Sequence, residues 1–182
     1  MSLLSFKAHA SQAAPTRWPM TGRPAGPSPG AGMLDRLNQS LRGELSAAET
    51  YGMALGRLET TARGDPAGRN VVADLRDLRD RHREHASRLR ELIDAAGGTP
   101  SADSGTWGVW ARAVMATASL FGPAAMLKAL KEGEEYGLAE YRAHLGELEN
   151  EAADLVRREL IPATRKQIDR LDELLLRRGP GQ

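Results

Sequence analysis

Residues 33–58 of the chain read MLDRLNQSLRGELSAAETYGMALGRL, and this stretch decides the fold. Its apolar residues recur at alternating steps of three and four, which places them along one side of an α-helix. The residues on that side are Leu34, Leu37, Leu41, Glu44, Ala48, Tyr51, Leu55 and Leu58. A stripe of this kind is typical of a helix in a packed bundle, and Glu44 is the charged residue that interrupts it.

Three later segments repeat this pattern, so the sequence predicts four long helices. Their stripes are Val71, Leu75, Leu78, His82, His85, Leu89, Leu92 and Ala96; Leu127, Leu130, Glu134, Leu138, Tyr141, Leu145 and Leu148; and Val156, Leu160, Thr164, Gln167, Leu171 and Leu174. Gly64-Asp65-Pro66 should end the first helix, and Gly97-Gly98 the second. Pro162 should kink or restart the fourth, because it lacks a backbone donor.

Residues 106–121 predict a shorter, mostly apolar helix in the middle connection. We expect it to cross the bundle and cover one end of the core. The alternative is a docking surface for a protein partner or a membrane, built around Trp107 and Trp110. The connection is long enough for a crossover, so the bundle need not run simply up-down-up-down.

Residues 1–32 are rich in proline and glycine and predict a disordered tail. Residues 33–178 form the predicted bundle, and residues 179–182 a flexible C-terminus. The tail has basic but no acidic residues, so a targeting segment and a mis-assigned start, with Met33 as the natural beginning, stay as alternatives. No stretch reaches the ~18 apolar residues of a membrane-spanning helix.

The composition excludes several classes of function. Lys and Arg (25) nearly balance Asp and Glu (24), so no net charge favours nucleic acid. The absence of cysteine excludes disulfides, thiolate metal sites and cysteine nucleophiles, and suits a cytoplasmic protein. The sequence has no phosphate-binding loop, nucleophile elbow or His-Glu-x-x-His motif.

Four polar residues fall on the apolar stripes of three predicted helices: Glu44, His82, His85 and Glu134. Polar groups buried in a bundle are costly unless they are paired. In helical bundles a metal ion held between facing helices often pairs them. The other explanation is a buried Glu–His network without metal, which can fix the register of the helices.

Several stretches resemble one of two known families. Residues 37–51, with Glu44-Leu45 shortly before Tyr51, are similar to the first helix of bacterioferritins, and residues 134–138 resemble their third helix. Residues 106–111, 120–122, 129–135 and 159–162 resemble more closely a bacterial ferritin-like four-helix family of unknown function. That second resemblance covers about residues 33–178. It implies an all-α, ferritin-like four-helix bundle with a short extra helix in the middle connection.

The ferritin-like chemistry needs one Glu from each of two helices and a Glu-x-x-His pair from each of the other two. By resemblance, Glu44 and Glu134 are the single carboxylates and His85 is one histidine. However, His82 stands where a bridging Glu belongs, and the fourth helix offers Thr164 and Gln167. With both bridging carboxylates missing, one metal ion is easier to justify than two. Two His and two Glu suit Fe, Zn or Mn, and Tyr51 and Tyr141 lie where they could hydrogen-bond to these ligands.

We therefore expect a ferritin-like protein that is not an enzyme and holds one metal ion, or none, and acts in storage, stress response or scaffolding. The alternative is a metal-dependent oxidoreductase of the ferroxidase type with a reduced site. A homo-oligomer and a protein partner bound through the Trp107/Trp110 helix are open alternatives. Metal content of the purified protein, and oxygen consumption after loading with Fe(II), distinguish these hypotheses.

Overall fold

A computed structural model describes residues 31–61 and 66–178 of the chain. Three predicted features lie outside the described residues: the C-terminus at 179–182, the Gly64-Asp65 break and most of the tail. Ala31 and Gly32, which the sequence assigned to the tail, already belong to the first helix.

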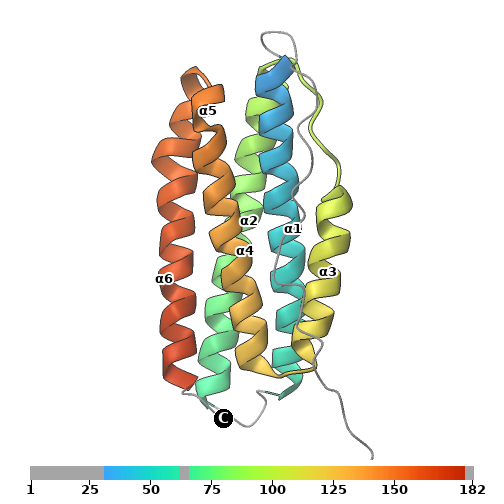
Figure 1. Cartoon of the computed structure of the whole chain (residues 1–182), viewed down its shortest axis with the longest axis vertical. Helices are drawn as coiled ribbons and strands as arrows, with labels where there is room; N and C mark the ends of the chain where they lie inside the picture. The colour runs from blue at the N-terminus through green and yellow to red at the C-terminus, as the bar shows by residue number, and fades with distance from the viewer. Residues whose placement is uncertain (1–30, 62–65, 179–182) are drawn as a thin grey trace, which may run out of the picture.

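The described residues are mostly helical, and no strand occurs among them, as the sequence predicts (Figure 1). The elements are α1 (Ala31–Thr61), α2 (Pro66–Ala95), α3 (Gly105–Ser119), α4 (Pro123–His144), the short 3₁₀ turn η2 (Leu145–Glu147), α5 (Asn150–Leu155), the π-helical segment η3 (Val156–Leu160) and α6 (Ile161–Arg178). None of the described helices is both long and apolar enough to cross a membrane.

Paired side chains fix the directions of the long helices, which lie side by side in Figure 1. Glu44 and Glu59 of α1 meet His82 and Arg76 of α2, so these two helices are antiparallel. α4 is also antiparallel to α1, since Tyr141 lies beside Glu44 and Glu134 beside Tyr51. Asp74 of α2 pairs with Arg170 of α6, and Arg88 of α2 pairs with Glu159 of η3, which leads into α6, so α6 is antiparallel to α2. Hence α2 and α4 run in the same direction.

The middle connection is a crossover, because two helices that run in the same direction cannot be joined by a short turn. α3 lies within this connection and runs alongside α1, in the same direction (Figure 1). The prediction that the short helix crosses one end of the core is therefore wrong. Apolar residues on one of its sides, including Met115, pack into the bundle from the flank, which the sequence pattern alone does not reveal.

The end of α4 and the region before Pro162 differ from the stripes in the sequence. α4 stops at His144, so Leu145 and Leu148 lie beyond it, and Leu148 is extended, with a ψ of 147°. The predicted interruption near Pro162 is a π-helical turn directly before it. This wider turn accommodates the proline ring and its missing N–H without ending the helix.

The apolar core consists of two clusters. One is built around Tyr51, Leu75, Leu127 and Leu171, and the other around Leu37, Leu89 and Leu160. Between them lies a polar layer of buried side chains: Glu44, His82, Glu134, Thr164 and Gln167. A layer of polar groups inside a bundle is stable only if hydrogen bonds or a ligand satisfy it.

The contact between α3 and α1 gives the first testable prediction. Ser104 donates to Glu49 at 2.9 Å, and Arg112 pairs with the same carboxylate at 3.0 Å. A Cβ atom on Gly108 would overlap the Ser104 hydroxyl and lie 2.9 Å from Glu49 Oε2. We expect Gly108→Ala to lower the free energy of unfolding by about 1–3 kcal/mol, measured by urea denaturation.

Gly56→Ala is the matched control for this prediction. Gly56 is exposed on α1, and nothing lies within 4 Å of an added Cβ. This substitution should stabilise the chain by about 0.5–1 kcal/mol, because alanine favours a helix more than glycine does. Equal effects of the two substitutions would contradict the close packing of α3 on α1.

Candidate metal centre

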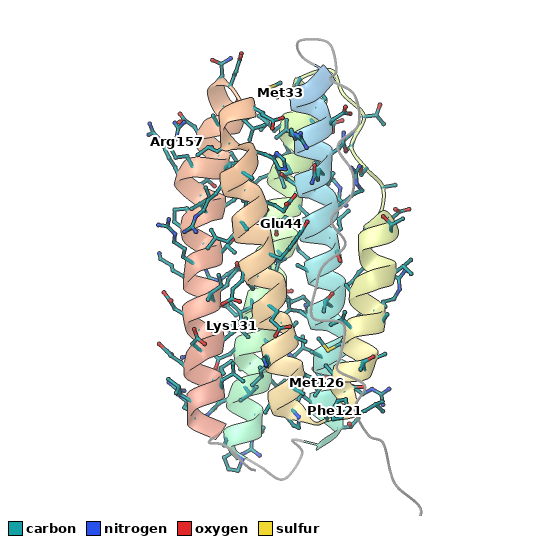
Figure 2. All side chains as sticks on the ribbon, in the orientation of Figure 1. Met33, Glu44, Phe121, Met126, Lys131 and Arg157 are labelled. Carbon is teal, nitrogen blue, oxygen red and sulfur yellow. The ribbon has the colours of Figure 1, made fainter. Side chains whose placement is uncertain are left out.

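The centre of the polar layer is made by three helices. Glu44 comes from α1, His82 from α2 and Glu134 from α4, and each is at most 5% exposed. Figure 2 shows Glu44 roughly midway along the bundle, between the ribbons of α1 and α4. Each residue continues the apolar stripe of its helix, and this position is the reason that it faces the core.

His82 lies between the two carboxylates and contacts both. Its Nδ1 is 2.7 Å from Glu44 Oε2, and its Nε2 is 2.8 Å from Glu134 Oε1. Both ring nitrogens must carry a proton to donate to both acids, so the metal-free arrangement is an imidazolium between two carboxylates. This arrangement leaves the layer with one more negative than positive charge.

His85 lies one turn further along α2, and its side chain is 12% exposed. Its Nδ1 is 3.5 Å from Glu44 Oε2, a poor distance for a hydrogen bond, and this buried nitrogen has no hydrogen-bond partner among the described residues. One ligand atom from each of Glu44, His82 and His85 lies within 4.8 Å of the others. These three residues could hold a metal ion.

Two tyrosines donate to the same carboxylates. Tyr51 Oη donates to Glu134 Oε1 at 2.8 Å, and Tyr141 Oη donates to Glu44 Oε1. Both contacts bear out the expectation that these residues reach the candidate ligands. Burial, followed by the nearby carboxylate charges, raises the pKa of both phenols well above 10, so both stay protonated donors at neutral pH.

The charges of the layer shift two pKa values strongly. Burial alone would raise the pKa of Glu44, but the charge and hydrogen bond of His82, followed by the nearby His85, outweigh it, and the pKa falls to about 2. Burial would likewise lower the pKa of His82, yet the charges of Glu134 and Glu44 raise it to about 10. The pair is therefore ionised over the physiological range.

α6 supplies the weakest part of the layer. Thr164 donates its hydroxyl to the Leu160 carbonyl of its own helix at 2.9 Å. Both amide atoms of Gln167 are buried and have no hydrogen-bond partner in the described part of the chain. Neither residue is an anionic ligand.

The structure brings together three of the four predicted ligands in one group and places the fourth beside it. Glu134 contacts His82 through the ring nitrogen that faces away from Glu44, and it is not part of the Glu44–His82–His85 group. Its role as a direct ligand stays a prediction. The side chains of Trp107 and Trp110 lie outside the described part of the structure, so the partner surface predicted there also stays a prediction.

A cavity of about 120 Å³ opens beside the layer, between α1 and α4. Sequence reasoning missed it, because it depends on small residues rather than on polar ones. Gly43 and Ala47 of α1 line it, as do Gly133 and Gly137 of α4. The signal in the sequence is their spacing, since each pair is four residues apart and therefore lies on one side of its helix.

The fold and the polar layer define an all-helical bundle with a buried carboxylate–imidazole centre. Residues 66–147, just under half of the chain, match the family model of a domain of unknown function (DUF2383). The matched segment contains His82, His85 and Glu134, whereas Glu44 lies before it. No curated protein and no solved structure gives a significant match.

Proposed function

We propose that this chain is a ferritin-like bundle that binds one divalent transition-metal ion through Glu44, His82 and His85. The observation that carries the proposal is the buried Nδ1 of His85, which lacks a hydrogen bond although it lies 3.5 Å from a carboxylate oxygen. A buried polar atom without a partner costs free energy, and coordination would remove that cost.

The donor set fits such an ion. Imidazole nitrogen and carboxylate oxygen bind Zn²⁺, Fe²⁺ and Mn²⁺ at about 2.0–2.2 Å, so two ligands of one ion lie about 3–3.5 Å apart. Glu44 Oε2 and His85 Nδ1 are already at 3.5 Å. The 2.7 Å contact between Glu44 and His82 would have to lengthen by a few tenths of an ångström.

Glu134 supports the same proposal as an outer partner. If His82 binds through Nδ1, its Nε2–H can still donate to Glu134 Oε1, the contact that the structure contains at 2.8 Å. A carboxylate behind a metal-binding histidine fixes the ring and its tautomer. Tyr141 would orient Glu44 in the same way.

Three ligands for one ion suit metal handling or scaffolding better than bulk storage, because one ion per chain carries little metal. Ferroxidase activity stays the alternative. The protein loaded with Fe(II) tests it, since a ferroxidase would consume oxygen in proportion to the iron added.

Titration of the chelator-treated full chain with Co(II), Zn(II) and anaerobic Fe(II) tests the metal site. We expect one ion per chain. Glu44→Gln and His85→Leu should weaken binding at least tenfold. Glu134→Gln should weaken it by about 10–100-fold without changing the stoichiometry, because the residue acts through His82.

His144→Leu is the matched control for the histidine variants. His144 lies near the surface of α4, where it pairs with Glu140 and Glu147. Its removal should leave metal binding unchanged. A wild-type protein that retains no metal, or a His85→Leu variant that binds as tightly as the wild type, would overturn the proposal.

A further inference from the structure

The cavity between α1 and α4 has a polar floor and mostly apolar walls. Glu44, Tyr51, His82 and Glu134 belong to the floor, whereas Val114, Met115 and Leu130 contribute apolar surface. Because the polar layer is reached from this side, a molecule in the cavity would touch buried carboxylates and aliphatic side chains at once.

Small residues keep the cavity open. A Cβ atom added to Gly43 or to Gly137 would meet nothing within 4 Å. Ala47 and Gly133 continue the two rows, so these four positions of α1 and α4 add little side-chain volume to the cavity. The space between two such rows is a slot, which suits a flat ring better than a branched chain.

One carboxylate oxygen on the floor is free. Both hydrogen bonds to the Glu134 carboxylate, from Tyr51 and from His82, are accepted by its Oε1 atom. Its Oε2 accepts no hydrogen bond from the residues that the structure describes, although the side chain is only 5% exposed. This oxygen is not one of the fully buried polar atoms without a partner, so it is accessible to a molecule in the cavity that Glu134 lines, and the hydroxyl of a ligand can donate to it.

We propose that this cavity binds a neutral aromatic alcohol of phenol size, with its hydroxyl donated to Glu134 Oε2 and its ring in the slot between α1 and α4. The volume agrees, because an apolar cavity of about 150 Å³ in another protein holds benzene. The excess negative charge of the layer excludes an aromatic carboxylate of the same size. The inference stands without a metal ion and does not rest on the proposed function.

Isothermal titration of the chelator-treated full chain with phenol, benzene and benzoate tests this proposal. We expect saturable binding of phenol at one molecule per chain. Benzene should bind at least tenfold more weakly, because it leaves Glu134 Oε2 unpaired, and benzoate should not bind. Failure of phenol to bind at millimolar concentration would overturn the proposal while leaving the metal titrations unaffected.

Filling the slot is the second test. Gly137→Leu should weaken phenol binding at least tenfold while the chain stays folded and still binds one metal ion. Gly56→Leu is the matched control, since this exposed glycine lies on α1 outside the cavity and should change nothing. Phenol binding that Gly137→Leu leaves intact would place the ligand elsewhere and contradict the proposal.

Light scattering on the same variants measures the oligomeric state. It tests whether a second copy of the chain occupies the slot instead of a small molecule. If the wild type is a dimer that Gly137→Leu dissociates and phenol does not bind, the slot is filled by a second copy of the chain, and the proposal is wrong. An oligomeric state that is the same in the wild type and in Gly137→Leu supports a small-molecule site.

Discussion

Replacing His82 with leucine is expected to lower the free energy of unfolding of the chelator-treated protein by about 3–5 kcal/mol. His82 is 3% exposed and supplies the one positive charge between the Glu44 and Glu134 carboxylates. Leucine has a similar volume, so the loss comes from two buried acids without a counter-charge rather than from a cavity. Urea denaturation at pH 7 measures the effect.

Two further variants separate this cause from a simple packing defect. Glu44→Gln and Glu134→Gln, added to His82→Leu, remove the unpaired charges and should restore part of the lost stability. The loss in His82→Leu alone should also shrink between pH 7 and pH 4.5, because burial without the counter-charge raises the pKa of Glu44, which can then take up a proton. His144→Leu, near the surface, should change stability by at most about 0.5 kcal/mol. A His82→Leu variant as stable as the wild type would contradict the pairing.

The height of the polar layer in the bundle could be predicted from the sequence. Glu44, His82 and Glu134 each continue a stripe of apolar residues, and a helical stripe specifies both the buried side and the position along the axis. The same reasoning shows why α6 offers no carboxylate, since Thr164 and Gln167 occupy the matching positions.

The hydrogen-bond partners of the individual side-chain atoms in this layer could not be predicted from the sequence. A stripe says that His82 and His85 face the core, but not that the first lies between two carboxylates while a nitrogen of the second has no partner. Those details depend on side-chain rotamers and on the separation of the helices. The path of α3 was missed for a related reason, because its length and apolarity do not specify which helix it packs against.

The pH dependence of stability is the second large effect. The pKa of His82 rises from its ordinary value of 6.5 to about 10 on folding. The folded state therefore holds this proton more tightly than the unfolded chain, so the stabilisation is fully present below pH 6.5 and is lost as the pH rises towards 10. We expect stability to fall by up to about 1.4 kcal/mol per pH unit in that range.

The pKa shift of Glu44 predicts that stability changes with pH in the opposite direction at acidic pH. Its pKa falls from 4.5 to about 2 on folding, so its stabilisation is present above pH 4.5 and is lost as the pH falls towards 2. Between about pH 4.5 and 6.5 both contributions are complete. Urea denaturation of the chelator-treated protein across the whole range should therefore show a plateau there and a decline on either side.

The fall in stability at alkaline pH can be assigned to His82 only if the contribution of the tyrosines is separated from it. Tyr51 and Tyr141 have pKa values raised above 10, so they too lose stabilisation at high pH, but only where the unfolded phenols begin to ionise, near pH 10. Measurements between pH 6.5 and 9.5 isolate the histidine. In that window His82→Leu should be nearly independent of pH while the wild type declines. An equal decline in both proteins would show that another group causes the slope. It would contradict the presence of an imidazolium in the core of this bundle.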